Sequence, residues 1–288
     1  MEKYWKEKEK LINSALDGFL KEKDGEAEEL LQWMRYSSLA GGKRIRALLI
    51  IAIGEMFKKP AEKFLPSACG IEMIHTSSLI LDDLPCMDDA VIRRGKPALH
   101  RVTGEANAIL SAYALLAKGI ELIAQNACAL KIDIARVERI IKSITQAVGI
   151  KGISLGQFLD LKYSEFNYSQ EDIERVHLYK TASLFISTAE IAGILAGAKE
   201  KDLQVLKDYA KNLGLAFQIR DDLLEKKKEK QKKYSLKDGQ RPNYRKLLGR
   251  KEAEKTFLKY REKAILSLQK FGRKAERLKE LIEFLELK

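Results

Sequence analysis

Two short stretches of the sequence concentrate carboxylates. The stretch LILDDLPCMDDA holds Asp82, Asp83, Asp88 and Asp89, and the stretch FQIRDDLLE holds Asp221, Asp222 and Glu225. Clustered carboxylates repel one another unless a cation compensates them. Hard oxygen ligands without a nearby Cys or His pairing favour Mg²⁺ over zinc. Because Mg²⁺ held by a few carboxylates usually completes its shell with phosphate oxygens and water, the sequence predicts a site for a phosphate ester.

Both clusters continue an apolar helical stripe. Leu203, Leu206, Ala210, Leu213 and Phe217 recur at steps of three and four, and Asp221 is the next position on that face. Ile71, His75, Ser78 and Asp82 share a face by the same spacing. Acidic side chains at inward positions are costly unless something compensates them. Helix capping or a wet surface explains either cluster alone, but two such clusters together favour metal binding.

Basic residues accompany the carboxylates. Arg93, Arg94 and Lys96 follow the first cluster, GGKRIR places Lys43, Arg44 and Arg46 after a glycine pair, and Lys180 opens a long apolar stretch. Arginine suits bidentate contacts to phosphate oxygens. The glycine pair is not a Walker loop, because the following Ser or Thr and the strand context are absent.

Helical periodicity dominates the chain, with no convincing alternating strand and no linker rich in glycine, serine or proline. The expected helices are 3–22, 27–39, 43–57, 61–84, 104–127, 133–150, 152–164, 170–197, 201–225, 251–270 and 274–286. The only long polar break is 226–243. This pattern predicts one all-α domain over residues 1–288.

The formal net charge of +12 has two interpretations. A polyanionic partner, such as nucleic acid, an anionic membrane or a phosphorylated substrate, is one. A solvated lysine-rich surface is the other, and it is favoured because residues 226–233 hold six lysines. Three cysteines without metal-like spacing and no visible signal peptide predict a reducing, cytoplasmic location. The apolar run 181–198 carries Glu190 and is short for a membrane span, so we expect a buried helix and no integral membrane segment.

Taken together, these residues resemble the trans-isoprenyl diphosphate synthases, the polyprenyl synthetase family, and among them bacterial geranylgeranyl diphosphate synthases. The motifs that carry the resemblance, from Gly41 to about Gly249, are GGKRIR, EMIHTSSLILDD, DDLPCMDD with RRGKP, GQFLD, YKTASLF and FQIRDD. The resemblance implies an isoprenoid synthase fold, a single helical bundle around a deep central cavity. It also implies a homodimer, three Mg²⁺ ions, and isopentenyl and allylic diphosphates as substrates.

The resemblance also implies roles for individual residues. Asp82, Asp88 and Asp221 are the expected principal metal ligands, with Asp83, Asp222 and Glu225 beside them. Arg93 is expected to contact the allylic diphosphate, and Lys43, Arg46, His75 and Arg94 the isopentenyl diphosphate. Lys180, Thr181 and Gln218 are expected to flank the reacting carbons and the departing diphosphate, while Gln157 and Asp160 match the GQ-x-x-D element.

Two departures from the family pattern concern the second acidic motif. It ends in Glu225, where aspartate is usual, so the carboxylate moves outward by one methylene. In the following loop, KDGQRPNYRKLLG, Arg241 stands where a lysine is expected. Positive charge is therefore kept at that position.

Product length follows from the residues before Asp82. Ser78 and Ser77 lie roughly 6–7.5 Å up the helix at 1.5 Å per residue. In the family an aromatic residue at the Ser77 position closes the pocket at a C15 product, so two serines predict a C20 product, with C15 as the alternative. A terpene cyclase, a non-catalytic subunit and a basic helical nucleic-acid or membrane-surface protein are rivals; the isopentenyl site and the two intact clusters argue against them.

Overall fold

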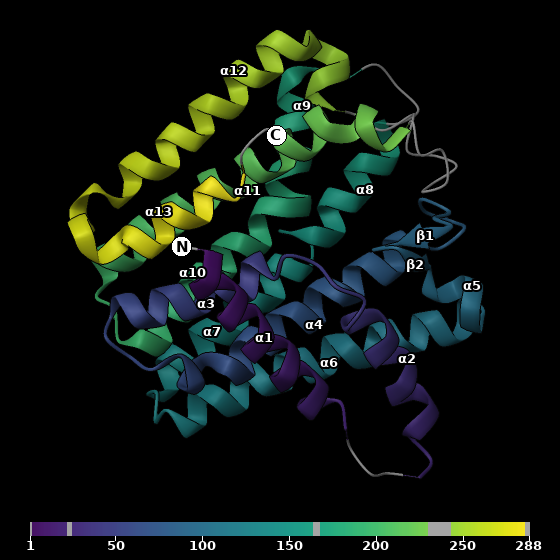
Figure 1. The fold of residues 1–288 in the computed structure, drawn as a ribbon, viewed down its shortest axis with the longest axis horizontal. Helices are drawn as coiled ribbons and strands as arrows, with labels where there is room; N and C mark the ends of the chain where they lie inside the picture. Colours follow the sequence, from purple (N-terminus) through teal and green to yellow (C-terminus); the bar gives the residue numbers. More distant parts are fainter. Residues whose placement is uncertain (1, 22–24, 164–167, 230–242, 286–288) are drawn as a thin grey trace. The chain divides into compact units, whose positions relative to one another are not determined.

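The computed structural model describes residues 2–21, 25–163, 168–229 and 243–285. These residues are almost entirely helical (Figure 1). Their one β-hairpin, with two residues in each strand, lies between α4 and α5. The prediction of an all-α chain is confirmed. The chain divides into two compact units. The first takes in the described residues of Met1–Ile51 and Ala61–Lys131, and the second those of Ala52–Pro60, Ile132–Gln231 and Gln240–Lys288. The single domain over 1–288 stays a prediction.

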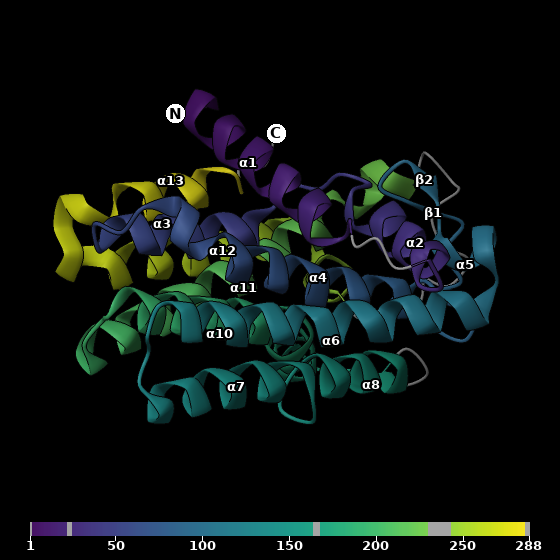
Figure 2. The same cartoon turned by 90° about the horizontal axis from the view of Figure 1, so that it is seen from below.

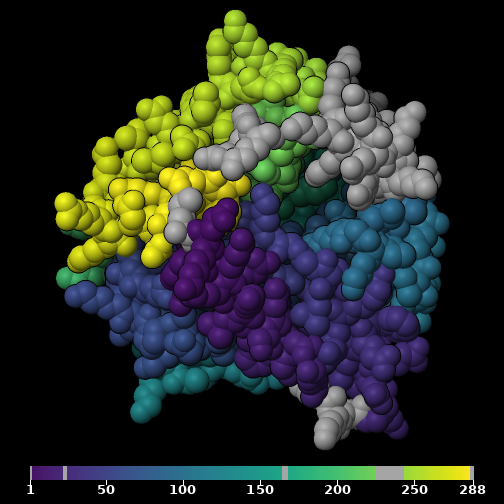
Figure 3. Space-filling view, in the orientation of Figure 1, coloured from purple at the N-terminus to yellow at the C-terminus, as the bar shows by residue number. Residues whose placement is uncertain are grey.

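The first unit contains the N-terminal helices and the helix that ends in the first acidic cluster. Its elements are α1 (Glu2–Phe19), α2 (Glu28–Ser38), the start of α3 (Ile45–Met56), η1 (Ala61–Phe64), α4 (Leu65–Asp82), β1 (Ile92–Arg93), β2 (Lys96–Pro97), α5 (Leu99–Thr103) and α6 (Glu105–Ala129). The amphipathic α1 turns Trp5, Ile12 and Leu16 inward, and its other face lies at the surface (purple in Figure 3).

Helices α4 and α6 form the core of this unit and lie side by side (Figure 2). Gly70 and Gly119 make the close packing possible, since a Cβ atom on Gly70 would lie 2.5 Å from the carbonyl oxygen of Gly119. By length and composition alone, Ala61–Asp82 and Glu105–Ala129 could cross a membrane; 67% and 39% of their apolar windows are buried. Core helices pass the same test, so this is weak evidence for a membrane segment.

A buried ion pair fixes the entry to α3. Arg44 has a left-handed backbone (φ 52°), and its guanidinium donates to Ser38 O at 2.6 Å, to Asn13 Oδ1 at 2.9 Å and to Glu72 Oε2 at 3.3 Å. The second oxygen of Glu72 accepts from the backbone N–H of Ala47 at 3.3 Å. The side chains of Arg44 and Glu72 are 1% and 3% exposed. This pair therefore ties the start of α3 to the middle of α4.

The second unit contains the helices around the second acidic cluster. Its elements are the end of α3, α7 (Ile134–Val148), α8 (Ile153–Tyr163), α9 (Gln170–His177), the π-helical turn η2 (Leu178–Ala182), α10 (Ser183–Ala196), α11 (Glu200–Glu229), α12 (Tyr244–Ser267), η4 (Leu268–Ala275) and α13 (Glu276–Glu283). The predicted buried helix is confirmed, because almost every residue of α10 is buried. It packs between α7 and α11, and α11 packs along α12 (Figure 1).

Two helix boundaries show where tertiary structure modified the predicted pattern. The predicted helix 170–197 is interrupted by the π-helical turn η2. Helix α12 begins at Tyr244, before the predicted start at 251, but Gly249 has non-helical angles (φ 76°, ψ 166°) that kink it there. The regular part of α12 therefore starts close to the predicted position, because glycine permits the left-handed angle that breaks the first turns.

Candidate active site

The first acidic cluster surrounds the end of α4. The loop that follows folds back on the helix, so that the backbone N–H of Asp88 donates to Asp82 O at 2.9 Å and that of Ala90 to Asp83 O at 3.1 Å. Asp82 and Asp88 are thereby brought together by the backbone, although six residues separate them. Asp89 turns away to pair with Arg101 at 2.6 Å. The loop therefore gives the carboxylates different surroundings: Asp82 and Asp88 are linked through the backbone, Asp83 faces Arg93, and Asp89 faces Arg101.

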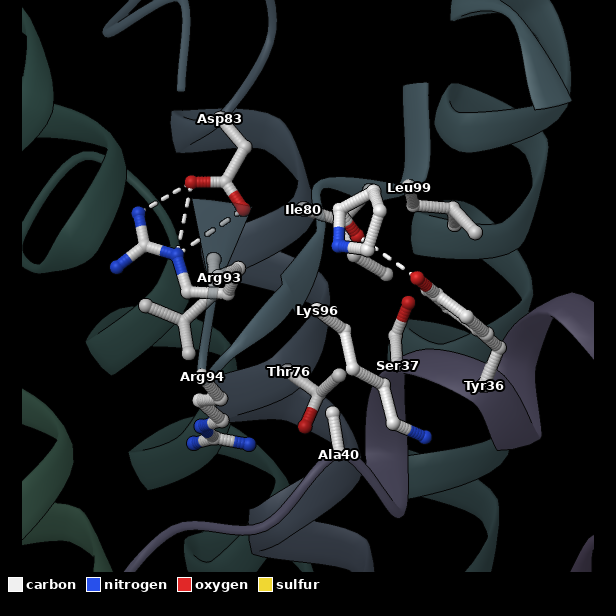
Figure 4. A pocket seen from close by; sticks show the side chains of 12 residues that line it. Tyr36, Ser37, Ala40, Thr76, Ile80, Asp83, Arg93, Arg94, Lys96 and Leu99 are labelled. Atoms are coloured by element: carbon white, nitrogen blue, oxygen red, sulfur yellow. Dashed lines mark hydrogen bonds and ion pairs between the residues drawn. The ribbon is translucent and has the colours of Figure 1, made fainter. Parts of the chain in front are cut away.

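Asp83 holds Arg93 on the hairpin. The Nε atom of Arg93 donates to both Asp83 oxygens, at 2.9 and 3.0 Å, and its Nη2 contacts Oδ1 (Figure 4). Burial raises the pKa of Asp83, against the opposing effect of Arg93. The turn between β1 and β2 uses positive φ at Arg94 (52°) and Gly95 (80°), which is the signature of a tight hairpin turn. The hairpin was beyond the reach of the sequence pattern because each strand has only two residues.

A small pocket lies between α4, α2 and the β1–β2 hairpin. Thr76, Ile80 and Asp83, on one helix face, line it together with Tyr36 and Lys96 (Figure 4). Its accessible volume is about 20 Å³, which holds roughly one water molecule. It is too small for a diphosphate, and it lies on a different face of α4 from Asp82.

Four predicted diphosphate-binding residues lie in the same unit. Arg46 Nη1 lies 3.4 Å from His75 Nε2. Burial, followed by the charges of Arg46 and Arg94, lowers the pKa of His75 well below its usual value, so the imidazole is neutral at pH 7. Lys43 is exposed beside Gly42. Within the described residues, Arg94 Nη1 is buried without a hydrogen-bond partner, and such an atom suits an anionic ligand.

The guanidinium of Arg94 approaches the glycine turn before α3. A Cβ atom on Gly42 would lie 3.0 Å from Arg94 Cζ, and Gly42 itself has φ 117°. A larger residue would be strained there and would displace the guanidinium. Arg94 and Thr76 both line the small pocket, and in Figure 4 the guanidinium of Arg94 points away from the Asp83–Arg93 pair. The two neighbouring arginines therefore have different surroundings: Arg93 is paired with Asp83, and Arg94 lies against the glycine turn before α3.

The predicted chain-length residues lie on α4 in different environments. Ser77 is 3% exposed and Ser78 is partly exposed. The hydroxyl of Ser78 donates to His75 O at 2.9 Å, within its own helix. A small residue at the buried position 77 leaves space that a larger one would fill.

In the second unit, the π-helical turn carries Lys180 and Thr181. The ammonium of Lys180 donates to Asp160 Oδ2 at 2.7 Å, and Asp160 is itself buried. Helix α8 comes so near that a Cβ atom on Gly156 would overlap the Lys180 backbone. Gly156 is therefore required for the close approach, and it explains the glycine of the GQFLD motif; Gln157, beside it, is 7% exposed. Single π-helical turns inside α-helices are frequent at functional sites.

Thr181 begins a chain of hydrogen bonds that reaches α12. Its hydroxyl donates to Gln218 Oε1 at 2.7 Å, and Gln218 Nε2 donates to Asp222 Oδ1 at 3.3 Å. Asp222 Oδ2 accepts from the backbone N–H of Tyr244 at 3.0 Å and lies 3.4 Å from His177 Nε2. Burial lowers the pKa of His177 to about 3, so this imidazole is neutral as well.

The two aspartates of the second motif differ in exposure. The side chain of Asp221 is 32% exposed, and Arg220 Nη1 lies 3.5 Å from its Oδ1, whereas the side chain of Asp222 is 6% exposed. Consecutive helical residues point about 100° apart at 3.6 residues per turn. The side chain of Glu225 and all of Arg241 lie outside the described residues, so their predicted roles are not tested.

The carboxylates suit Mg²⁺ by chemistry but do not form a complete cage. Among the described residues, no three His, Cys, Asp or Glu side chains converge closely enough to hold a metal ion. Mg²⁺ commonly binds one or two protein carboxylates and takes its other ligands from substrate phosphates and water. The pair Asp82 and Asp88 in the first unit, and Asp221 in the second, each have the ligand chemistry for that mode of binding.

Sequence reasoning missed two residues that organise the site, His177 and Glu72, and it named Arg44 only as one of the basic residues of GGKRIR. His177 lies three residues before Lys180, and a lone histidine next to a motif is its only signal. Glu72 and Arg44 form the buried pair described above. A single acid within the otherwise apolar SACGIEMI indicates a buried partner, but the pattern does not identify that partner.

Both units are built almost wholly from helices, with one aspartate pair at the end of α4 and another within α11, and cationic side chains lie near each pair. The family model for polyprenyl synthetase matches residues 27–245. The chain belongs to the polyprenyl synthetase family, which confirms the resemblance inferred from the motifs.

Relatives and solved structures agree with this assignment. "Putative geranylgeranyl pyrophosphate synthase 8, chloroplastic" of Arabidopsis thaliana is 44% identical over 195 residues, covering 67% of this chain and 54% of the relative. The chain thus matches about half the length of that protein. An FPP/GFPP synthase from Zymomonas mobilis has a TM-score of 0.87 and 31% identity, covering 99% of this chain and 100% of its own.

A second solved structure has ligands. The geranyltransferase of Helicobacter pylori, complexed with magnesium and isoprenyl diphosphate, has a TM-score of 0.84 and 26% identity, covering 98% of this chain and 95% of its own. Both structural relatives cover nearly all of the present chain, so the isoprenyl synthase fold is confirmed.

Proposed function

We propose that this protein is a Mg²⁺-dependent prenyltransferase that joins isopentenyl diphosphate head to tail with an allylic diphosphate, giving the C20 product geranylgeranyl diphosphate. The observation that carries the proposal is the family match across both acidic motifs and the basic residues beside them. The plant relative named geranylgeranyl pyrophosphate synthase supports the C20 length. The C15 product is the alternative, and the name of the Zymomonas mobilis relative includes FPP synthase.

Basic side chains of the first unit bind the diphosphates in this proposal. Arg94 and Arg46 contact isopentenyl diphosphate, with Lys43 at the rim, and the buried, unpaired Nη1 of Arg94 supports that role. His75 donates a hydrogen bond as a neutral imidazole. Arg93 contacts the allylic diphosphate, held in place by Asp83. Fixed donors of this kind hold the reacting carbons close together.

Side chains of the second unit act at the reacting carbons. Lys180, positioned by Asp160, neutralises charge on the departing diphosphate. Thr181 and Gln218 lie beside the allylic carbons, where positive charge builds as the C–O bond breaks. The buried helix α10 excludes water from this charge. The double bond of isopentenyl diphosphate attacks the positively charged allylic carbon and forms the new C–C bond, and the resulting cation loses a proton to the released diphosphate, which leaves the new double bond.

Asp82 and Asp88 of the first unit and Asp221 of the second would hold Mg²⁺, which would supply positive charge to the leaving diphosphate. The number of three ions and the roles of Glu225 and Arg241 stay predictions from the sequence, as does a cytoplasmic location.

Mass analysis of products tests the proposal. The purified protein is incubated with Mg²⁺, isopentenyl diphosphate and either dimethylallyl or farnesyl diphosphate. We expect a C20 product from both primers, and none when isopentenyl diphosphate or Mg²⁺ is omitted. A cyclic hydrocarbon formed without isopentenyl diphosphate would instead identify a cyclase, and no turnover with either primer would overturn the proposal.

Ser77→Tyr should shorten the product to C15. The ring fills the space beside the buried Ser77, and the matched variant Ser77→Ala keeps the space and the C20 product. Chromatography of dephosphorylated products measures the lengths. Overpacking of a core commonly costs about 1–3 kcal/mol, so the unfolding midpoint is recorded beside it. A folded Tyr variant with an unchanged product would contradict the pocket argument.

We also propose a homodimer formed through α6. Ile109, Leu110 and Tyr113 are 37%, 57% and 70% exposed on this helix, and large contiguous apolar patches mark interaction surfaces. Light scattering should give about twice the chain mass of 32.7 kDa. The double variant Leu110→Asp/Tyr113→Asp should be monomeric, whereas Leu258→Asp, at a similarly exposed leucine of α12 (54%), should stay dimeric. A wild-type monomer would end this proposal.

A further inference from the structure

Asp222 is the acceptor at the end of a directional hydrogen-bond chain. Its two oxygens receive the amide of Gln218 at 3.3 Å and the backbone N–H of Tyr244 at 3.0 Å, and His177 Nε2 lies 3.4 Å away. Both oxygens therefore act as acceptors in these contacts. Its side chain is 6% exposed, compared with 32% for the neighbouring Asp221.

This acceptor determines which way round Gln218 is placed. A side-chain amide has a donor end and an acceptor end of nearly the same shape. With Nε2 turned to Asp222, Oε1 must face Thr181, and the Thr181 hydroxyl gives its proton to Oε1 at 2.7 Å. The remaining lone pairs of Thr181 Oγ1 then suit a neighbour with positive charge.

We propose that Asp222 is a positioning residue that acts through Gln218, in place of the metal ligation predicted from the sequence. It orients the amide so that Thr181 presents lone pairs, and not a proton, to the allylic carbons as they become positive. The inference rests on the proposed function for the identity of that positive charge. His177 supports the same direction, because its Nε2 lies 3.4 Å from Asp222 Oδ2 while its Nδ1 is buried without a partner among the described residues, so a proton on Nε2 has Asp222 as its acceptor. Of the two adjacent aspartates, the more exposed Asp221 is then the one left to bind metal.

Moving the negative charge from position 222 to position 218 tests the direction of the hydrogen bonds between Thr181, Gln218 and Asp222. Asp222→Asn keeps the shape, but its amide presents a donor to Gln218. Gln218 must then flip, and Thr181 turns its proton outward. Gln218→Glu alone places two carboxylates in contact. In the double variant Gln218→Glu/Asp222→Asn, the amide introduced at position 222 donates to the carboxylate introduced at position 218, and that carboxylate accepts from Thr181. The backbone N–H of Tyr244 keeps an oxygen acceptor. The direction at Thr181 is thereby restored.

We expect each single variant to lower kcat by about 10-fold or more, with KM little changed, and the double variant to recover to within about 3-fold of wild type. Unfolding midpoints, measured without substrate or metal, should fall in both single variants and recover in the double. Binding of Mg²⁺ with inorganic diphosphate, measured by calorimetry, should stay within about 2-fold for Asp222→Asn and weaken at least about 10-fold for the control Asp221→Asn.

Any other result would contradict a specific part of the proposal. If the unfolding midpoint recovers in the double variant but kcat does not, these hydrogen bonds only stabilise the fold, and the positioning role of Asp222 is wrong. If Asp222→Asn loses Mg²⁺–diphosphate binding as Asp221→Asn does, Asp222 is a metal ligand. If wild type shows no prenyl transfer, the proposed function fails, while the midpoints still decide whether the chain has the direction inferred.

Discussion

Asp82→Ala and Asp221→Ala should each lower kcat by about 10²–10³-fold, because each removes a carboxylate that would hold the Mg²⁺ needed to compensate charge on the departing diphosphate. Asp82 is partly exposed at the end of α4, and Asp221 is 32% exposed on α11. Surface substitutions away from buried networks usually change stability little. Release of diphosphate measures kcat, and circular dichroism on heating measures the unfolding midpoint, which should stay close to that of wild type.

Asp89→Ala is the matched control for this experiment. Asp89 belongs to the same cluster but pairs with Arg101 at 2.6 Å, outside the predicted ligand set, so its removal should leave kcat within a few-fold. The double variant Asp82→Ala/Asp221→Ala tests the sequence prediction that both clusters serve one diphosphate, since residues that act as a unit lose activity together. Its loss should not exceed that of the worse single variant. Near-normal turnover in both single variants would reject the metal roles.

The largest effect on stability is expected from Glu72→Ala. Removing one partner of a buried ion pair typically costs about 3–5 kcal/mol, because the other charge stays buried without compensation. Here Arg44 would keep only its contacts with Asn13 and Ser38, and the backbone N–H of Ala47 would lose its acceptor. Urea unfolding followed by circular dichroism measures the loss of free energy of unfolding.

The double variant Arg44→Met/Glu72→Leu separates charge from packing. Replacing both charges by apolar side chains of similar volume is often close to neutral, so the double variant should lose less than Glu72→Ala alone. A loss below about 1 kcal/mol in Glu72→Ala would contradict the role of this pair. Because α3 begins beside it and carries Arg46, Glu72→Ala should also raise KM for isopentenyl diphosphate.

The helices of the fold could be predicted because their signal is local. Apolar spacing placed α11 and its aspartates, and Pro66 at the start of α4 and Gly197 after α10 agree with ordinary helix ends. The hairpin of β1 and β2 and the kink at Gly249 escaped the prediction, since two-residue strands and a single left-handed residue leave no period in the sequence.

The candidate site could likewise be predicted only in part. The motifs identified which residues to consider, but side-chain direction depends on residues far along the chain. Asp83 contacts Arg93 ten residues later, and Asp222 contacts Tyr244 twenty-two residues later. Both aspartates resemble their neighbours in sequence, and only the folded structure shows that they are buried against these partners. The necessity of Gly156 likewise follows from the approach of Lys180, which no local pattern reports.

The π-helical turn at Leu178–Ala182 has a consequence for variation in this chain. Such a turn carries one residue more than an α-helical path between the same ends. Removing that residue would leave α9 and α10 continuous but rotate one against the other by about 100°. Lys180 would then leave Asp160, and Thr181 would leave Gln218. Sequence relatives should therefore tolerate exchanges of residue type in this turn far better than a change in its length.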